Sequence, residues 1–313
     1  MRAFVVGNYM NANFLHVPRL PQAGETVAAT AIFREHGGKG LNLALGLRRL
    51  GAEVALLLTL GRDEPGASAT AFLAANGIDV THVHAVDTPS GYGVGFIAPD
   101  GSNILCPYLG ANLVLDETHV AAARADIKAA RWTAATFESP ERAILPAFAL
   151  ARRAGARTYL NAGPWREIDA ELESLIDVLA LNESEAAGFF ARPGLAQASR
   201  DDWRAILADH PRARGWAGRW LVVTLAARGA IARGPDGAVI EAPAFAVDQI
   251  DATGAGDAFG AGLVVALDEG MAEPLTFANA CGAMVARAQG VLAALPTRPD
   301  AQAFARRTPR AET

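Results

Sequence analysis

The chain has 313 residues, and its 28 Lys and Arg against 33 Asp and Glu give a formal net charge of −5. Hydrophobic residues make up 51% and charged residues 19%, which is typical of a folded chain with a full core and argues against disorder. The acidic balance argues against a nucleic-acid or anionic-membrane partner, so we expect neither.

Apolar runs and cysteines indicate the compartment. The longest strongly apolar runs, such as Val54–Leu58, fall far short of the roughly 20 residues that a bilayer span needs. The first residues carry one charge and a very short apolar run, unlike a signal peptide. Cys106 and Cys281 are the two cysteines, so we expect no disulfide framework and predict a reducing, cytoplasmic location.

Strand-like and helix-like segments alternate along most of the chain. Ala3–Gly7 is a short apolar run that predicts a buried strand, and Gly38–Leu50 has helical apolar spacing that ends at Gly51. The other expected elements are strand 53–60, helix 64–76, strand 132–137, helix 141–154, strands 157–160, 177–181 and 220–225, and helices 256–267 and 274–288. Such alternation predicts a mostly parallel sheet covered by helices on both faces.

Two segments break this alternation and predict a second, smaller sheet. Residues 14–33 and 91–106 each look like paired strands joined by turn residues. We expect one domain over residues 1–313, with lid strands inserted at about 13–33 and 91–106. The last residues, about Arg307–Thr313, are expected to fray.

The most specific motif is the run Asp251-Ala252-Thr253-Gly254-Ala255-Gly256-Asp257, which opens a long apolar helix. Glycines at a helix start let backbone N–H groups approach an anion, and the helix dipole favours negative charge there. Asp257 in this turn fits a base that removes a hydroxyl proton during phosphoryl transfer. An ordinary helix N-cap is the alternative interpretation of Asp257.

A second glycine-rich motif, Gly37-Gly38-Lys39-Gly40-Leu41-Asn42, also opens a helix. It is not a Walker A loop, because glycine and not Ser or Thr follows the lysine. Its amides, Lys39 and Asn42 could hold the hydroxyls of a polar ligand. A plain strand-to-helix turn with a solvated lysine is the alternative.

Together the two motifs resemble the signatures of the ribokinase-like (PfkB) carbohydrate kinase family. Weaker matches follow in the family's order, at residues 110–112, 137–140, 161–164, 182–185 and 224–229. The resemblance covers nearly the whole chain. It implies a ribokinase-like three-layer α/β sandwich with a mostly parallel central sheet and a small β-sheet lid.

The resemblance also implies roles for individual residues. Asp257 matches the general base, and Gly254, Ala255 and Gly256 match the anion hole. The substrate-binding positions are Asn11, Asn13, Gly38, Lys39, Asn42, Glu138 and Asp257. The ATP-binding positions are Asn182, Thr224, Arg228, Gly229, Gly254, Gly256 and Asn279.

Two metal sites are implied in the same way. Glu185, with Asn182, matches the motif that supports Mg²⁺ through water. A monovalent site, usually for potassium, matches Asp251, Thr253, Val285, Ala288 and Gly290. The implied cofactors are therefore ATP, Mg²⁺ and K⁺.

The implied function is an ATP-dependent sugar kinase that transfers the γ-phosphoryl group to a primary hydroxyl of a pentose, with ribose the first candidate. Asn13 stands where the family usually has Asp, which puts strict ribose specificity in doubt. A nucleoside kinase, a kinase for another sugar or sugar acid, and a non-catalytic sugar or nucleotide sensor are the alternatives. Exposed lid strands further predict a homodimer through the lid.

Overall fold

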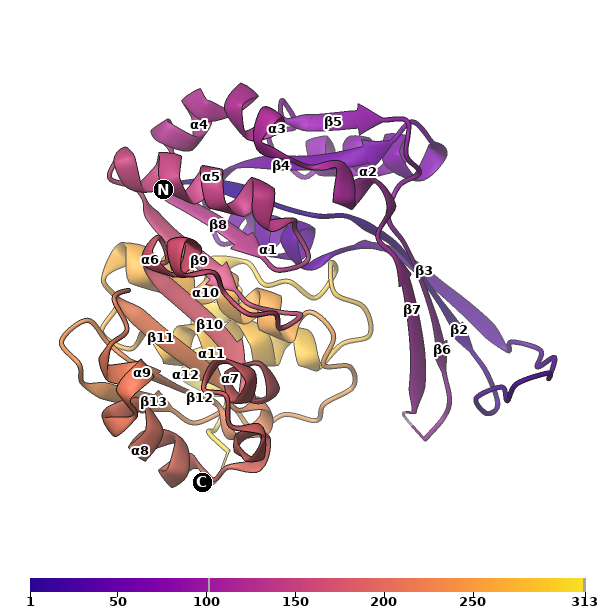
Figure 1. Ribbon diagram of the computed structural model, residues 1–313. Coiled ribbons are helices and arrows are strands. Elements are labelled where there is room, and N and C mark those ends of the chain that lie inside the picture. Colours follow the sequence, from indigo (N-terminus) through magenta and orange to yellow (C-terminus); the bar gives the residue numbers. More distant parts are fainter. Residues whose placement is uncertain (101, 312–313) are drawn as a thin grey trace.

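The computed structural model describes residues 1–100 and 102–311, which form two sheets (Figure 1). The large sheet has nine strands in the order β13-β12-β11-β10-β9-β8-β1-β4-β5. These strands are β1 (Arg2–Val6), β4 (Glu53–Gly61), β5 (Val83–Val86), β8 (Trp132–Thr136), β9 (Arg157–Asn161), β10 (Val178–Asn182), β11 (Trp220–Thr224), β12 (Ala230–Arg233) and β13 (Val239–Ala242). Neighbouring strands are parallel from β5 to β11, and β12 and β13 add antiparallel pairs at one edge.

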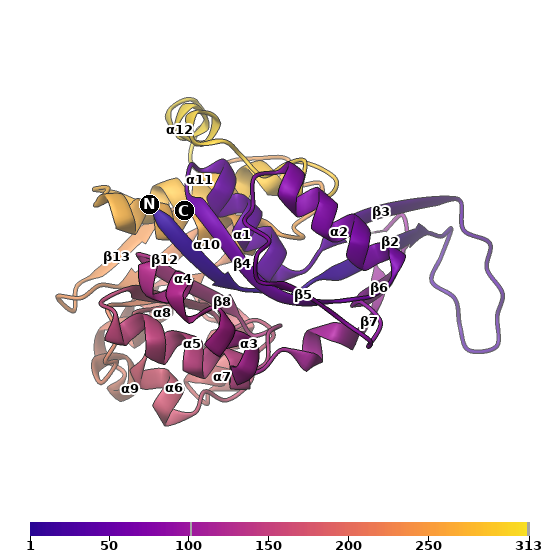
Figure 2. The ribbon, with the colours of Figure 1, turned by 90° about the horizontal axis from the view of Figure 1, so that it is seen from above.

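Helices cover both faces of this sheet (Figure 2). One face carries α1 (Lys39–Arg49), α2 (Glu64–Ala75), α10 (Ala255–Glu269) and α11 (Pro274–Ala286), with α12 (Arg298–Arg307) packed outside α11. The other face carries α3 (Glu117–Ala122), α4 (Arg124–Ala129), α5 (Glu141–Arg153), α6 (Ala170–Ser174), α7 (Glu183–Phe189), α8 (Arg200–Asp209) and α9 (Pro211–Arg214). Short 3-10 turns are η1 (Gly110–Val114), η2 (Pro193–Gln197) and η3 (Ala226–Arg228). The predicted fold class is confirmed.

Burial on both sides explains the apolar strands. In β1, Ala3, Phe4, Val5 and Val6 have no exposed surface. Ala3 and Val5 belong to the core beneath α1 and α10, whereas Phe4 and Val6 belong to the core on the opposite face. Continuous apolar strands of this kind are typical of parallel sheets buried by helices on both sides.

The small sheet projects from one side of the body (Figure 1). Its order is β3-β2-β6-β7, and its strands are β2 (Met10–His16), β3 (Ala31–Gly37), β6 (Tyr92–Ile97) and β7 (Asn103–Tyr108). The central pair β2 and β6 is parallel, and the two outer pairs are antiparallel. The predicted side sheet is thus confirmed, although Gly101 of the predicted second turn lies outside the described residues.

Close backbone contact places the start of α1 at the carboxyl end of β1. A Cβ atom at Gly40 would lie 2.4 Å from the Cα of Gly7, so only glycine fits there. Because parallel strands end at one edge of a sheet, β1, β4 and β8 to β11 all present their carboxyl ends to the same side.

The expectation of a frayed tail is wrong for the described residues. After α12, the Ala246 amide donates to the Pro309 carbonyl and the Ala311 amide donates to the Ala244 carbonyl. Arg310 also lies 4.1 Å from the centre of the Phe245 ring. The tail is therefore fixed up to residue 311, while residues 312 and 313 lie outside the described residues. Among the described helices, none is both long and apolar enough to cross a bilayer.

Candidate active site

The two glycine-rich motifs meet where α1 and α10 begin. The side-chain amide of Asn42, on the first turn of α1, donates a 2.9 Å hydrogen bond to Asp257 Oδ2. Lys39 Nζ lies 4.0 Å from Asp257 Oδ1. The first contact joins positions 215 residues apart in the chain, so the two motifs form one site.

Asp257 is not the N-cap of its helix. Gly254 takes that position in the left-handed conformation, with φ 74°, and no side chain caps the helix. Asp257 lies inside the first turn and is only 3% exposed. The N-cap interpretation is therefore wrong.

The surroundings of Asp257 suit a proton acceptor. Burial raises the pKa of its carboxyl to about 6, while Lys39 and the Asn42 amide lower the pKa but do not cancel that effect. Its Oδ1 atom and the Asn42 Oδ1 atom are buried and have no hydrogen-bond partner among the described residues. The charge of Asp257 in turn raises the pKa of Lys39, which keeps that side chain cationic. The site therefore offers a basic oxygen that lacks a donor, which a substrate hydroxyl can supply.

Glycines shape the start of α10. A Cβ at Gly254 would lie 2.3 Å from the Val291 side chain, whereas a Cβ at Gly256 would meet nothing within 4 Å. The Ala255 amide donates to the Ala252 carbonyl. The first turn of a helix leaves amides without intrahelical partners, so this helix start can receive an anion beside Asp257.

A cavity of about 60 Å³ connects the helix start to the ends of the central strands. Its lining is Lys39, Tyr159, Asn161, Ala180, Leu181, Asn182, Glu185, Thr224, Gly256 and Phe259. Residues predicted for the sugar, the nucleotide and Mg²⁺ thus surround one space. Tyr159 and Asn161 were not predicted to have a role, although Asn161 belongs to a motif that the sequence showed.

Asn182 and Glu185 also form the capping box of α7. Asn182 Oδ1 accepts the Glu185 amide at 2.9 Å, and Glu185 Oε2 accepts the Asn182 amide at 2.8 Å. Burial raises the pKa of Glu185, and the Asn182 amide and the Lys39 charge oppose this effect. Within the described residues, no group of three or more His, Cys, Asp or Glu could hold a metal ion. A magnesium ion commonly keeps several waters and needs few protein ligands.

Glu138 lies beside the start of α1. Its Oε2 atom accepts the Lys39 amide at 2.8 Å and the Asn8 side-chain amide at 2.7 Å. Asn8 Oδ1 accepts the Gly40 amide at 2.8 Å. Gly38 has φ 106°, and a Cβ there would lie 2.8 Å from the Asn8 carbonyl oxygen. Asn8, two residues after the end of β1, was not predicted because the sequence does not show that it bridges Glu138 and α1.

A larger cavity of about 390 Å³ separates the small sheet from the body. Met10, Ala12 and Phe14 of β2 line it. The rest of its lining is Gly93, Val94, Leu105, Cys106, Pro107, Leu109, Leu113, Phe137, Glu138, Ser139, Pro140, Pro164 and Arg166. Because side chains alternate along a strand, Asn11 and Asn13 lie on the other face of the sheet. The structure therefore does not bring these two residues to Glu138, contrary to the expected sugar contact.

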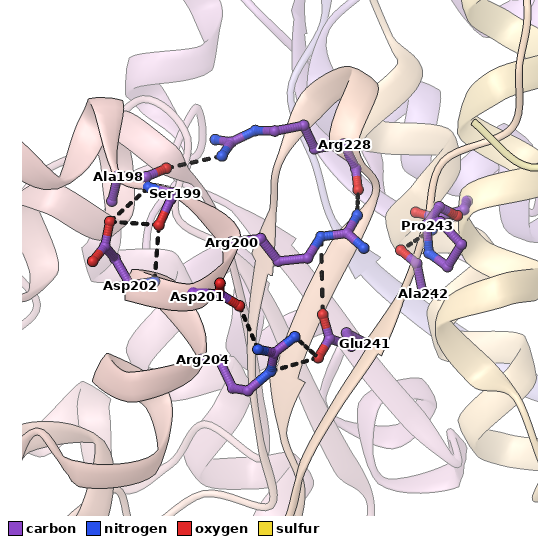
Figure 3. A network of polar contacts seen from close by, with 11 residues as sticks. Ala198, Ser199, Arg200, Asp201, Asp202, Arg204, Arg228, Glu241, Ala242 and Pro243 are labelled. Atoms are coloured by element: carbon purple, nitrogen blue, oxygen red, sulfur yellow. Dashed lines mark hydrogen bonds and ion pairs between the residues drawn. The ribbon is translucent and has the colours of Figure 1, made fainter. Parts of the chain in front are cut away.

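The expected nucleotide loop follows β11 (Figure 3). Gly229 has φ 95°, and a Cβ there would lie 2.2 Å from the Ala242 carbonyl oxygen. The Asn279 side-chain amide donates to the carbonyls of Ala242 and Pro243, both at 3.1 Å. Gly229 and Asn279 thus meet at Ala242. The side chain of Arg228 extends toward the Ala198 carbonyl, 2.9 Å away, where it fastens the loop to the start of α8.

The residues predicted for a monovalent cation also come together. The Ala286 carbonyl, at the end of α11, accepts the amides of Ile250 at 2.8 Å and Asp251 at 3.2 Å. Asp251 Oδ1 accepts the Thr253 amide at 2.9 Å. In β3, Glu35 accepts the Val291 amide through both oxygens, at 3.1 and 3.2 Å. Of the predicted positions, Val285 lies in the last turn of α11, and Ala288 and Gly290 lie in the loop between α11 and Val291.

Glu35 was not predicted to belong to this region. Burial raises the pKa of Glu35, and the nearby charge of Asp251 raises it further. In the part of the chain that the structure describes, neither carboxylate forms an ion pair with Lys or Arg. A bound cation would balance the charge of these two carboxylates, which have no ion-pair partner among the described residues.

Comparison with known proteins agrees with this geometry. The model of the pfkB family carbohydrate kinases matches residues 2–298. The chain is 30% identical over 305 residues to a ribokinase of Haemophilus influenzae, covering 96% of this chain and 97% of that protein. It is 29% identical to a ribokinase of Mus musculus, covering 95% and 92%.

A solved structure shows the same fold. The ribokinase of Arabidopsis thaliana, complexed with ribose and ATP, matches with a TM-score of 0.85 at 24% identity, covering 97% of this chain and 98% of that one. Together these findings confirm the resemblance and make the protein a phosphotransferase that acts on an alcohol group. The chain belongs to the pfkB family of carbohydrate kinases.

Proposed function

We propose that this kinase transfers the γ-phosphoryl group of ATP to a primary hydroxyl of a pentose, with ribose the first candidate. The observation that carries the proposal is the buried Asp257 carboxylate, whose Oδ1 atom lacks a donor beside the glycine-bearing start of α10. Lys39, Asn42 and Glu138 supply polar groups around the same space. The relatives' names support the choice of sugar.

The reaction follows from these positions. The substrate hydroxyl donates its proton to Asp257 as its oxygen forms a bond to the γ-phosphorus. The bond between the γ-phosphorus and the bridging oxygen breaks, and its electron pair leaves with ADP. Lys39 and the first amides of α10 stabilise the negative charge on the moving phosphoryl group, so the protein contributes mainly position and electrostatics.

We propose two ions. Mg²⁺ near Glu185 would neutralise phosphate charge when bound, through waters held by Glu185 and Asn182. A potassium ion at the Asp251 turn would hold the loop that leads into Gly254, with Thr253, Val285, Ala288 and Gly290 as the other positions. The uncompensated charges of Asp251 and Glu35 support this second site.

The nucleotide is proposed to lie along the carboxyl ends of β10 and β11. The proposed contacts are Asn182, Thr224, Arg228, Gly229, Gly254, Gly256 and Asn279. We further propose that residues 1–313 act as one domain in the cytoplasm, with no nucleic-acid or membrane partner. Asn11 and Asn13 are left out of the proposed sugar site because of their place on the small sheet.

A nucleoside kinase is the second candidate, and the cavity beneath the small sheet favours it. Met10, Ala12 and Phe14 offer no hydrogen bonds to sugar hydroxyls, and the opposite wall includes Phe137 and Pro164. An apolar cavity of about 390 Å³ next to Glu138 suits a planar group attached to the sugar.

We also propose a homodimer through the small sheet. Its strands β3 and β7 are edges, and the exposed large apolar side chains on the sheet that do not line the cavity beneath it are Ile32, Tyr92, Ile104 and Tyr108. Edge strands and apolar patches of this kind favour pairing of two copies.

The first prediction concerns the base. Asp257→Asn should lower turnover by about 10²- to 10⁴-fold, because the hydroxyl loses its proton acceptor. Sugar affinity should stay within a few-fold, since Asn can still accept from the Asn42 amide, and the melting temperature should not fall, since a buried carboxylate is removed. Coupled ADP detection, sugar calorimetry and thermal unfolding measure the three quantities.

Asp209→Asn, at an exposed position of α8, is the matched control and should keep the wild-type turnover. Near-normal turnover of Asp257→Asn would refute the assignment of Asp257 as the base.

The second prediction is a pH dependence. Asp257 must be ionised to accept a proton, and its pKa is raised to about 6, so kcat/KM should fall about tenfold per pH unit below pH 6 and level off above it. Unfolding does not explain this loss. The folded protein binds the proton of Asp257 more tightly than the unfolded chain, where the pKa is 3.8. This group therefore lowers the stability of the fold as pH rises through about 6, and not as pH falls. Rates and melting temperatures measured from pH 4.5 to 8 test both parts, and a flat profile contradicts the assignment.

The third prediction separates the substrates. In a panel of ribose, nucleosides, a ketohexose and a sugar acid, assayed with Mg²⁺, ribose should give the highest kcat/KM. Adding K⁺ to the same assays should raise the rate. If a nucleoside gives a kcat/KM at least tenfold higher than ribose, the protein is a nucleoside kinase, which is the second candidate. Tight sugar binding without ADP formation instead identifies a sensor.

The fourth prediction concerns assembly. Light scattering at micromolar concentration should give the mass of a dimer, and Ile104→Lys should give a monomer, because a charge on the exposed sheet opposes its burial. A monomeric wild-type chain is the result that excludes the dimer.

A further inference from the structure

Tyr159 carries a hydroxyl group that the fold buries without a partner. It is the third residue of β9 and lies between Ala134 of β8 and Val178 of β10. Its side chain has no exposed surface, and its Oη atom forms no hydrogen bond with any described residue. Because an unpaired buried hydroxyl lowers stability, phenylalanine would fit this position better if packing were its only task.

The hydroxyl lies against the first turns of α10. A Cβ added at Gly260, three residues after Asp257, would lie 2.3 Å from Tyr159 Oη. The absence of a side chain at Gly260 therefore leaves the space that the hydroxyl occupies. Tyr159 also lines the small cavity together with Lys39, Glu185 and Gly256.

The charges around the hydroxyl make it a donor. Burial and the charges of Asp257 and Glu185 all raise the pKa of Tyr159, so it keeps its proton. Glu185 lines the cavity and Asp257 lies close enough to act on Tyr159, so phosphate oxygens can enter only if donors and cations balance the negative charge. Lys39 supplies one positive charge, and a neutral O–H group adds a donor without adding charge.

We infer that Tyr159 is a catalytic residue whose hydroxyl donates a hydrogen bond to an oxygen of the phosphoryl group during its transfer. The inference rests on the proposed function, because the phosphoryl group reaches this cavity only if ATP binds beside Asp257. Tyr159 keeps its own proton throughout: Asp257 receives the proton of the acceptor, and the bridging oxygen leaves with ADP. The hydroxyl is paired only when the reacting group fills the cavity, so it favours the transition state over the empty enzyme.

Tyr159→Phe tests the inference because it removes one oxygen atom and keeps the ring. At a pH above 7, kcat should fall at least about tenfold, which corresponds to about 1.4 kcal/mol of transition-state stabilisation. The sugar KM should change less than about twofold, and the acid limb of the pH profile should stay in place. The melting temperature should be equal or higher, because an unpaired buried hydroxyl is gone.

Tyr9→Phe is the matched control. Tyr9 is equally buried, but its hydroxyl is paired with His36 Nδ1 at 3.0 Å and takes no part in the site. This variant should lower the melting temperature and leave kcat unchanged, which is the opposite of the result expected for Tyr159→Phe.

Gly260→Ala gives a second test. It should lower kcat in the wild-type chain, because the added methyl group displaces the hydroxyl of Tyr159. In a chain that already carries Tyr159→Phe, it should lower kcat by a clearly smaller factor.

Three outcomes overturn the inference. A Tyr159→Phe kcat within twofold of the wild type shows that the hydroxyl does not act in the reaction. A shifted acid limb with an unchanged plateau shows that it acts on Asp257 instead. Equal effects of Gly260→Ala in both backgrounds show that the helix start, and not the hydroxyl, is disturbed. A wild-type chain that forms no ADP with any acceptor overturns the proposed function itself, a result distinct from these three.

Discussion

One buried contact organises the site: the side-chain amide of Asn42 donates to one oxygen of Asp257, and the other oxygen has no hydrogen-bond partner among the described residues. This contact requires α1 and α10 to lie close together, and a Cβ at Gly46 would already lie 2.9 Å from the Ala261 side chain. Burial makes the carboxylate basic, but the same burial destabilises its charged form. Lys39 reduces that cost only in part, because its Nζ atom is 4.0 Å away. The folded state is therefore less stable because of a buried carboxylate that the reaction needs as a basic oxygen.

The small sheet is joined to the same helix start through one stretch of chain. Glu35 of β3 accepts the Val291 amide, and the Val291 side chain packs against Gly254, the N-cap of α10. Phe33 packs at Gly290 on the same face of the sheet. The base of the lid, the proposed cation loop and the proposed anion hole are therefore in direct mechanical contact. Two contacts, Glu35 with Val291 and Val291 with Gly254, thus connect β3 to the helix start.

Local signals in the sequence predict most of the fold. Alternating apolar runs and glycine stops predict the central sheet and its main helices, and the family resemblance carried by the two glycine-rich motifs predicts that Asp257 and Asn42 share a site. Prediction from the sequence fails where one residue of register decides the outcome: along β2, a shift of one position exchanges Asn11 and Asn13 for Met10 and Ala12 on the face toward the body. Glu35 was missed because its partner stands 256 positions later, a distance that no local pattern bridges.

The proposed acceptor site has a polar side and an apolar side, and this arrangement limits which molecules can bind. We call the polar residues Asp257, Asn42, Lys39 and Glu138 the floor of the proposed acceptor site, and the apolar residues of β2 its roof. Glu138, whose Oε2 atom accepts the Lys39 amide, also lines the cavity beneath β2. A sugar satisfies its hydroxyls only by turning them toward the floor, because burying a hydroxyl against the roof without a partner is costly. The floor therefore sets which hydroxyl meets Asp257, and it does so equally for every acceptor that contains the sugar. The roof must then distinguish a free sugar from a sugar with a planar substituent. Burying more apolar area against the roof is favourable, whereas burying a further hydroxyl there is not.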